Sequence, residues 1–269
     1  MEKLKTLSLV ILCFFIACSG FEKSEKAKIK KQNAVKEFIT RQDKSYFFPL
    51  ILPKRQVNEV YPWEENKIGE ISKISKEFFR CKGTFLNPVK VNDAGDILKD
   101  CVGSSKHSLP IINGHENVYP ILIDILNYIQ KRVKKKVVIT CGHRCPDHNV
   151  YADSAKSNRV SKHMIGAEVD FYVKGMEEKT LQIMDIIFDY YKNNSKYEKF
   201  ERLKNSKDVK TPPWYNSEIL VKLFTAQEGR DFDNRHPYPY ISIQVRNDSK
   251  TDKRVTYTWE KAYRGFMRW

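Results

Sequence analysis

The apolar positions in the second half of the chain predict two amphipathic helices. Within Val118–Lys134, leucine, isoleucine and valine recur at intervals of three and four residues, and a basic K-R-V-K-K-K run closes the segment. A second stripe of the same period lies between Glu177 and Asn193. This spacing gathers apolar side chains on one helix face, and cations favour a helix C-terminus. We therefore expect both segments to be helices that pack against a core.

Four short runs predict β-strands. They read K-V-V-I-T-C-G, A-E-V-D-F-Y-V, E-I-L-V-K-L-F-T-A and P-Y-I-S-I-Q-V-R. β-Branched and aromatic residues are enriched in all four, as is typical of strands. The helices and strands follow no regular βα alternation, and this mixture favours an α+β fold.

The N-terminus has the pattern of an export signal. Met1–Lys5 is positively charged, an apolar run extends from Leu7 to Ala17, and Cys18 follows. Such a segment is a secretory signal and is too short to span a bilayer. The run F-I-A-C resembles a lipobox, in which the signal is cut before a cysteine that carries diacylglycerol. We expect lipid attachment at Cys18, with a plain signal peptide as the alternative.

The chain is expected to have three parts. Residues 1–18 form the lipoprotein signal peptide, residues 19–70 a basic tether and N-terminal extension, and residues 71–269 the folded domain. The stretch after the signal is rich in lysine and glutamate and poor in large apolar residues. That composition suits a linker that holds a domain away from a membrane.

A formal net charge of +15 makes the chain strongly basic. Nucleic acid is the usual partner of such a protein, but export argues against it. Anionic lipid headgroups and anionic cell-wall polymers remain as partners, towards which a positive field would steer the protein. A generally lysine-rich proteome is the alternative explanation. We therefore expect membrane contact through the N-terminal lipid and no nucleic-acid partner.

The mature chain keeps four cysteines, Cys81, Cys101, Cys141 and Cys145. Outside the cytoplasm, four cysteines allow three disulfide pairings. We expect a disulfide between Cys81 and Cys101, worth on the order of 3 kcal/mol. The C-x3-C pair lies near His143 and His148, which is compatible with a structural zinc site. No second pair with metal-ligand spacing accompanies it, so this interpretation is the weaker one.

The clearest chemical signal is V-I-T-C-G-H-R-C-P-D-H-N, followed later by S-K-H-M-I-G-A-E-V-D-F. These motifs resemble the zinc D-alanyl-D-alanine carboxypeptidase family, whose hallmark is a Gly-aromatic-Arg turn and then S-x-H-x-x-G-x-A-x-D. The matched positions are Arg144, Ser161, His163, Gly166 and Asp170. Glu168 stands where alanine is usual, and His143 stands where tyrosine or phenylalanine is usual.

The resemblance extends from roughly Cys81 to the C-terminus and implies a hedgehog/D,D-peptidase-like fold. Such a domain has a small antiparallel sheet flanked by helices, and the family implies a bacterial cell envelope as its location. It also implies that His163 and Asp170 ligate Zn2+, which takes nitrogen and carboxylate ligands. Arg144 would hold a peptide carboxylate or stabilise an oxyanion. Ser161 would lie beside the substrate.

The family takes its third ligand from a late strand that reads aromatic-valine-His-valine-Asp, before a closing Arg-Trp. Here Y-I-S-I-Q-V-R occupies that strand, and the chain ends with Arg-Trp. Ser242 stands at the histidine position and Gln244 at the aspartate position. Side chains alternate along a strand, so both residues are expected on the substrate face, with Ile241, Ile243 and Val245 in the core. The expected third ligand is therefore missing from this strand.

Other residues are candidates for the third ligand. His236 lies six residues before Ser242, about 20 Å along an extended strand, and serves only if the prolines between them fold the chain back. Glu168 precedes Asp170 by two residues and points to the same face, about 7 Å away. It is a replacement ligand, a general base, or a carboxylate paired with a nearby cation. His143 is a lesser candidate, and the remaining histidines are expected in loops or packing: His107, His115 and His148.

Two functions follow from these observations. The first is a zinc metallopeptidase that cleaves a D,D or L,D bond in peptidoglycan peptides, as a carboxypeptidase or endopeptidase, with Glu168 and Arg144 in catalytic roles. The alternative is a non-catalytic module on the same fold that binds a peptide or cell-wall polymer after loss of the third zinc ligand. An envelope spacer without a ligand would not explain the hallmark residues.

Overall fold

The computed structural model describes residues 66–92, 95–153, 160–193, 196–204 and 209–269. All of them belong to one compact unit, Val60–Trp269. The predicted signal peptide, Cys18 and most of the predicted extension lie outside the described residues. Within the described ranges, no helix has the length and apolar character needed to cross a membrane.

A six-stranded sheet forms the centre of this unit, with strand order β7-β8-β12-β11-β10-β9. Every neighbouring pair in it is antiparallel. The strands in this order are β7 (Val137–Cys141), β8 (Glu168–Val173), β12 (Tyr240–Val245), β11 (Ile219–Phe224), β10 (Trp214–Tyr215) and β9 (Glu201–Arg202). The four predicted strands are confirmed as β7, β8, β11 and β12.

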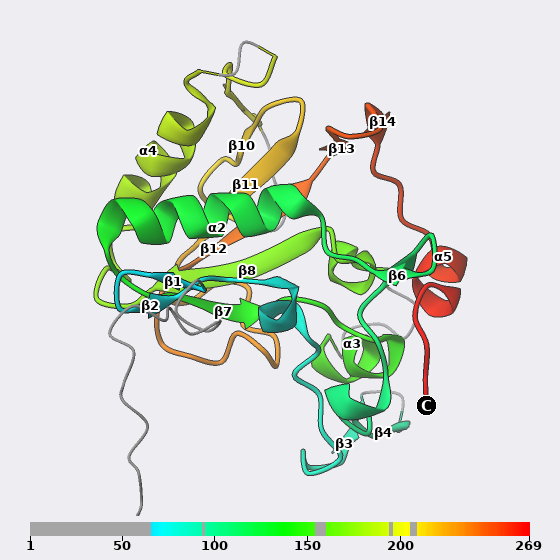
Figure 1. Ribbon diagram of the computed structural model, residues 1–269. Coiled ribbons are helices and arrows are strands. Elements are labelled where there is room, and N and C mark those ends of the chain that lie inside the picture. The colour runs from blue at the N-terminus through cyan, green and yellow to red at the C-terminus, as the bar shows by residue number, and fades with distance from the viewer. Residues whose placement is uncertain (1–65, 93–94, 154–159, 194–195, 205–208) are drawn as a thin grey trace, which may run out of the picture. The chain divides into compact units, whose positions relative to one another are not determined.

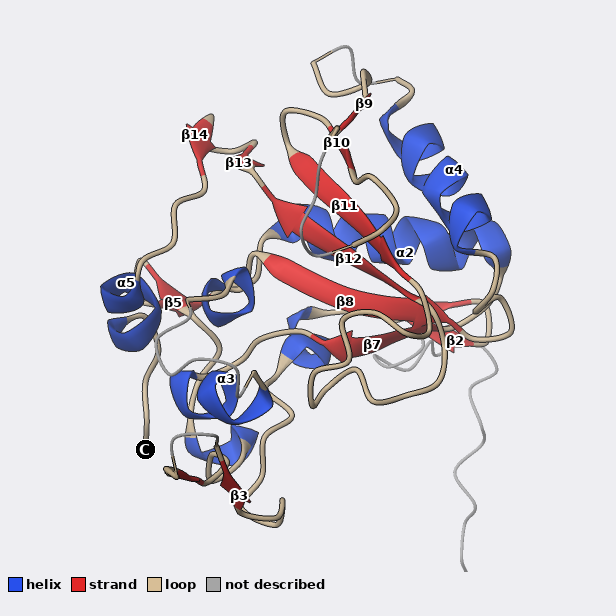
Figure 2. Cartoon of the chain, turned by 180° about the vertical axis from the view of Figure 1, so that it is seen from behind, coloured by secondary structure: helices blue, strands red, loops and turns tan. Residues whose placement is uncertain are grey.

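Two helices cover one face of the sheet, as Figure 1 shows. They are α2 (Pro120–Val133) and α4 (Thr180–Tyr191), the two predicted helices. Pro120 at the first turn suits a helix start, and Lys134 ends α2 in a left-handed conformation. Seen from behind in Figure 2, the strands lie in front of these helices. The apolar core lies between the helices and the sheet.

The two faces of the central strands differ as the alternation predicts. Ile241, Ile243 and Val245 of β12 lie in the core with Val169 and Phe171 of β8. The alternate positions face away from the helices. Cross-strand pairing sets Ser242 opposite Asp170 and Gln244 opposite Glu168, so these four polar residues are neighbours.

Short elements complete the described part of the chain. The 3-10 helices are η2 (Lys76–Phe79), η3 (Ser104–Lys106) and η4 (Lys162–Ile165), and two further α-helices are α3 (Pro146–Ala152) and α5 (Trp259–Arg264). Two-residue hairpin strands are β1 (Lys67–Ile68), β2 (Ile71–Ser72), β3 (Lys90–Val91), β4 (Ile97–Leu98), β5 (Ile111–Ile112), β6 (His115–Glu116), β13 (Asn247–Asp248) and β14 (Lys253–Arg254). The fold is thus a mixed one, with antiparallel sheets and helices.

The structure does not support the predicted disulfide between Cys81 and Cys101. The four cysteines of the described residues are all free and buried. Cys81 and Cys101 do lie close together, but Cys145 and His107 share the same cluster. Each thiol therefore has several polar neighbours rather than a single partner. Cys141 belongs to a different group, on the sheet.

Candidate metal centre

His163 lies on a turn that leads directly into β8. Ser161 caps this turn, because its hydroxyl accepts a hydrogen bond from the His163 backbone N–H at 3.2 Å. Gly166 ends η4 with φ of +68°, a left-handed conformation that favours glycine. A Cβ atom there would also meet the Asn117 carbonyl oxygen at 3.0 Å. The hallmark serine and glycine therefore position the histidine locally.

The imidazole of His163 points at the carboxylate of Asp170. Its Nε2 lies 3.4 Å from Asp170 Oδ2. On the other side of the ring, Nδ1 donates a hydrogen bond to the Gly142 carbonyl oxygen at 2.7 Å. Since a carbonyl only accepts, the proton of the neutral ring belongs on Nδ1 and the lone pair on Nε2 faces Asp170. This is the tautomer and orientation of a metal-ligating histidine.

Cys141 completes a group of three potential ligands. Its Sγ lies 3.4 Å from His163 Nδ1, and one ligand atom from each of Cys141, His163 and Asp170 lies within 4.8 Å of the others. A bulge in β7 makes this possible, because the register shifts after Ile139 and sets Cys141 opposite Asp170. Burial raises the pKa of the Cys141 thiol to about 12, so this thiol is protonated in the metal-free protein.

Asn234 orients the carboxylate of Asp170. Its side-chain Nδ2 donates to Asp170 Oδ2 at 2.9 Å, and its Oδ1 accepts from the Thr140 hydroxyl at 2.7 Å. Asn234 is fully buried. Thr140 is the extra residue of the β7 bulge. The bulge therefore places the side chains of two consecutive residues, Thr140 and Cys141, at the site. Asn234 is therefore held by Thr140 and in turn holds the carboxylate of Asp170.

Glu168 lies beside the same imidazole, with Oε1 3.8 Å from His163 Nε2. Oε1 accepts two hydrogen bonds, from the Ser242 hydroxyl at 3.0 Å and from Gln244 Nε2 at 2.6 Å. Among the ion pairs of the described residues, Glu168 takes part only in the one with His163. Within the described residues, no lysine or arginine forms the ion pair with Glu168 that the sequence offered as an alternative.

The electrostatics of the site are those of a buried cation among anions. Burial disfavours the charged imidazole, but the carboxylates of Glu168 and Asp170 outweigh it and hold the pKa of His163 well above its usual range. Burial likewise disfavours the Asp170 carboxylate, yet His163 and Arg144 lower its pKa. The metal-free site thus concentrates negative charge around Nε2, an environment that attracts a cation.

Arg144 is held by two carboxylates of the loop before β12. Its Nε donates to Asp233 Oδ2 at 2.6 Å and its Nη2 to Asp231 Oδ2 at 2.5 Å, and the side chain is buried. Two of its donors are thereby used within the protein. Arg144 lines the cleft as predicted, but the ion pairs tie it to this loop.

His148 extends the network of Arg144 on the far side of Asp233. Its Nε2 lies 3.0 Å from Asp233 Oδ1, and its Nδ1 lies 2.6 Å from Asp100 Oδ1. Burial alone would lower the pKa of His148, but hydrogen bonds to the two carboxylates raise it to about 9. His148 is therefore a charged link between two segments, which corrects its interpretation as a simple packing residue.

The other two histidine candidates lie elsewhere. His236 packs among aromatic rings, with centroids 5.1 Å from Tyr172 and 5.8 Å from Tyr240, and does not belong to the group of potential ligands. His143 packs edge-on against His107 and Phe266, and burial lowers its pKa to about 3. The structure therefore brings neither residue to the imidazole of His163.

The site opens into a cleft of about 1010 Å³. His163, Glu168 and Asp170 line it, together with the predicted substrate residues Ser161, Ser242 and Gln244. Its remaining walls carry many cations, Lys90, Arg144, Lys162, Lys222, Arg230 and Arg235, and four aromatic rings, Phe224, Phe232, Tyr240 and Tyr257. Cys141 is buried beside Nδ1 of His163 and does not line the cleft.

Sequence reasoning missed Cys141 and the acidic loop of Asp231, Asp233 and Asn234. The loop does carry a signal, since R-D-F-D-N-R-H packs three acidic or amide side chains into a stretch just before a strand. Cys141 carries a signal too, because it directly precedes the Gly-His-Arg turn, but its spacing from Cys145 suggested a disulfide cysteine or a ligand of a structural zinc site.

The antiparallel sheet presents a histidine nitrogen, a carboxylate oxygen and a thiol beside a polar cleft, an arrangement that can hold a metal ion. This donor set fits zinc, which accepts all three ligand types. Residues 99–188 match the family model described as Peptidase M15. The match contains β7, the turn of His163 and β8, and it supports the M15 family of zinc-dependent peptidases, which are related to D-alanyl-D-alanine carboxypeptidases. Comparisons with curated proteins and with solved structures give no match.

Proposed function

We propose that this chain is a zinc metallopeptidase that hydrolyses peptides of peptidoglycan, as a D,D- or L,D-carboxypeptidase or endopeptidase. The observation that carries the proposal is the 3.4 Å approach of His163 Nε2 to Asp170 Oδ2 at the floor of a cleft. Cys141 adds a third potential ligand to this pair. The M15 match over residues 99–188 supports the same class.

His163, Asp170 and Cys141 would hold the zinc ion, and Glu168 would remain free of it on the cleft side. Zinc bound in such a site polarises the scissile carbonyl and makes a bound water more acidic. The three residues supply one neutral and two anionic donors, and the cleft leaves access for water and substrate.

Glu168 is the proposed general base. Ser242 and Gln244 both donate to Oε1, which fixes this oxygen and leaves Oε2 to accept a proton from the attacking water. The same oxygen then returns the proton to the leaving amine, because a carboxylate that has taken a proton becomes the acid of the next step. Hydrogen bonds from two neighbouring side chains give the base a defined direction.

The substrate is proposed to be an anionic peptide. Lys162, Lys222 and Arg235 line the walls of the cleft and favour a ligand that carries carboxylates. Arg144 is proposed to act indirectly, since its ion pairs with Asp231 and Asp233 hold the loop that also carries Asn234. Asn234 in turn holds Asp170.

We also propose that the protein is anchored by lipid at Cys18 in a bacterial cell envelope, with cell-wall peptides or anionic wall polymers as its partners. The support is the sequence of the signal segment and the basic composition. Labelling of cells with radioactive palmitate tests the anchor. Label in the wild type that disappears in Cys18→Ala supports it, and an unlabelled wild type would contradict it.

The activity is tested with the purified mature chain and synthetic muropeptides. Peptides that end in D-Ala-D-Ala, and matched peptides amidated at the C-terminus, separate carboxypeptidase from endopeptidase activity by mass spectrometry of the products. We expect zinc-dependent hydrolysis that His163→Ala and Asp170→Asn abolish. A zinc-free wild type that binds the peptides without cleaving them would replace the peptidase with the binding module.

A further inference from the structure

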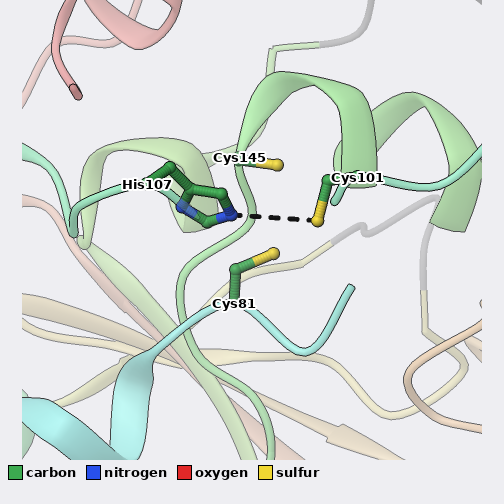
Figure 3. Close-up of side chains that lie close together, drawn as sticks. All are labelled: Cys81, Cys101, His107 and Cys145. Atoms are coloured by element: carbon green, nitrogen blue, oxygen red, sulfur yellow. Dashed lines mark hydrogen bonds between the residues drawn. The ribbon is translucent and has the colours of Figure 1, made fainter. Parts of the chain in front are cut away.

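A second group of potential metal ligands lies away from the cleft. The Sγ atoms of Cys81, Cys101 and Cys145 and a ring nitrogen of His107 all lie within 4.8 Å of one another. Figure 3 shows the three sulfurs and the imidazole pointing towards a common centre. The His107 Nε2 atom lies 3.8 Å from Cys101 Sγ. We refer to these four residues as the Cys3His cluster.

The spacing of the Cys3His cluster suits one tetrahedral ion. Zn–S bonds of about 2.3 Å and Zn–N bonds of about 2.0 Å place tetrahedral ligand atoms about 3.5–3.8 Å apart. The 3.8 Å between Cys101 and His107 has this value, and no pair in the cluster exceeds 4.8 Å. All four residues are buried, and no more than 4% of any of them is exposed. A closed set of four protein ligands is the mark of a structural zinc site.

The orientation of His107 favours metal ligation. Its Nδ1 donates to the Ser108 carbonyl oxygen at 3.2 Å, so Nε2 of the neutral ring keeps its lone pair towards the sulfurs. Backbone hydrogen bonds fix the segment on both sides of this residue, from Ser108 to Met267 at 2.8 Å and from Trp269 to Lys106 at 3.1 Å. The imidazole is thus held in place before any ion binds.

The surroundings of the sulfurs also fit a thiolate site. Cys145 Sγ accepts a hydrogen bond from the His148 backbone N–H at 3.4 Å. At Gly83 a Cβ atom would lie 2.4 Å from Cys101 Sγ and 2.8 Å from His148 Nδ1, so only glycine lets the backbone come this close. The chain after Cys81 therefore wraps tightly around the cluster.

The segment between Cys81 and His107 is held to the rest of the chain by side-chain hydrogen bonds, such as those of Lys90 and Pro88 with Tyr151, rather than by an apolar core. Among its described residues, 81–92 and 95–107, the regular structure is one pair of two-residue strands and one short 3-10 helix. Its large apolar side chains point outward, with Phe85 71% exposed, Leu86 77%, Val91 68% and Ile97 68%. The cysteines form a separate buried cluster with Phe266, apart from the main core. A segment without an apolar core is the kind that a metal commonly stabilises.

We propose that the Cys3His cluster binds one structural zinc ion that fastens residues 81–107 to the start of α3. Three thiolates and one imidazole are a standard ligand set for a structural zinc ion. A disulfide would join only two of the three sulfurs and leave a thiol and an imidazole unexplained. One ion uses all four groups at once.

The proposed ion would also stabilise the metal centre in the cleft. Cys145 follows Arg144, whose backbone N–H donates to the His163 carbonyl oxygen at 3.4 Å. Cys101 follows Asp100, which accepts from His148. Two ligands of the cluster are thus direct chain neighbours of the ion-pair network that holds the loop before β12. The cluster is a positioning element for the cleft and takes no part in its chemistry.

The experiment measures zinc in the mature chain purified with reductant. Wild type should contain two zinc ions per chain, and His163→Ala combined with Asp170→Asn should retain one. In that double variant, Co2+ in place of zinc should give an intense near-ultraviolet band from thiolate-to-metal charge transfer. Adding Cys101→Ser should remove the remaining ion and the band. His115→Asn is the matched histidine control, because His115 is exposed, and it should change neither.

A measurement on the unaltered chain guards against variants that fail to fold. Native mass spectrometry of the wild type should show bound zinc, and Cys81, Cys101 and Cys145 should react with iodoacetamide only after a chelator is added. A disulfide between any two of these cysteines in protein purified without reductant, or fast alkylation of all three without a chelator, would overturn the proposal. A wild type that contains zinc at the Cys3His cluster but none in the cleft would contradict the proposed peptidase and support the structural zinc site.

Discussion

Gln244 on β12 donates a hydrogen bond of 2.6 Å to Oε1 of Glu168, its cross-strand partner on β8. Ser242 donates to the same oxygen at 3.0 Å. These are three of the four positions at which the chain departs from the D,D-peptidase pattern, the fourth being His143, and these three contact one another. The carboxylate expected on the late strand therefore comes from the neighbouring strand, and the residues in the late strand support it.

Glu168→Gln tests the role of this carboxylate. The amide keeps the shape of the side chain but cannot take a proton, so we expect kcat to fall by about 10²–10⁴-fold while the zinc content stays unchanged. Steady-state kinetics and metal analysis of the same preparation check both parts. Ser242→Ala is the control, because it removes only one hydrogen-bond donor to Glu168 Oε1 and should lower kcat much less than Glu168→Gln does. Full activity in Glu168→Gln would exclude Glu168 as the base.

The third zinc ligand is tested by comparing two substitutions. Cys141→Ser should weaken zinc binding in the cleft by more than about 100-fold, since loss of an outer partner alone typically costs 10–100-fold. His236→Ala should leave zinc binding unchanged, because His236 packs among Tyr172, Tyr238 and Tyr240. Zinc titration against a chromophoric chelator measures both. The reverse result would make His236 the ligand and require the loop before β12 to rearrange.

Asn234→Ala tests the outer support of the site. This change removes the 2.9 Å hydrogen bond to Asp170 Oδ2 and should lower zinc affinity by about 10–100-fold. Thr140→Val is the matched comparison, since it removes only the bond from Thr140 to Asn234 and should have a smaller effect. Equal zinc affinity in Asn234→Ala and wild type would show that Asp170 is held without this partner.

The regular elements and the polar face of β12 follow from periodicity alone. Apolar residues at three- and four-residue spacing predicted the helices α2 and α4. The alternation along β12 correctly predicted that Ser242 and Gln244 lie on the face opposite Ile241 and Ile243. Such patterns work because one face of each element must be buried. They carry no information about which strands become neighbours, so the contact between Glu168 and Gln244 was not foreseeable.

His163 and Asp170 were expected as ligands from the family resemblance, whereas Cys141 and the Cys3His cluster escaped prediction for physical reasons. Cys141 reaches Asp170 only because β7 contains a bulge, which a strand pattern does not reveal. The Cys3His cluster takes its ligands from separate loops, whereas the sequence suggested a disulfide between Cys81 and Cys101 and, as the weaker interpretation, a zinc site at the closely spaced Cys141 and Cys145. His236 was a candidate for the missing third ligand only if the two prolines after it folded the chain back. Arg230 instead shapes this loop by donating to the carbonyl oxygens of Asn234, His236 and Tyr238.

The stability of the fold should depend on pH through His148. Its pKa in the folded protein is about 9, above the ordinary value of 6.5, because Asp100 and Asp233 face its two nitrogens. A raised pKa means that the folded state binds the proton more tightly. The resulting stabilisation is complete below about pH 6.5 and is lost as pH rises through 9, and it amounts to at most about 3 kcal/mol.

Urea unfolding of wild type and His148→Gln at pH 6 and pH 10 measures this contribution. Other groups, including the thiols, titrate in both proteins, so the informative quantity is the difference between the two. We expect wild type to lose more unfolding free energy than His148→Gln between the two pH values. The same loss in both proteins would show that His148 is neutral in the fold.

Ser242→His separates the peptidase from the non-catalytic module. Ser242 pairs with Asp170 across β8 and β12 and lines the cleft, so an imidazole at this position would approach the proposed zinc ligands. If Cys141 already completes the site, wild type binds zinc in the cleft and hydrolyses muropeptides, and the substitution adds no further ion. It should then lower activity, because Glu168 loses the hydroxyl that fixes Oε1. The opposite pattern is a wild type without cleft zinc or hydrolysis and a Ser242→His variant that gains both. That pattern would mean that the natural chain binds wall peptides without cutting them, since a single missing ligand would then be all that separates it from an active peptidase.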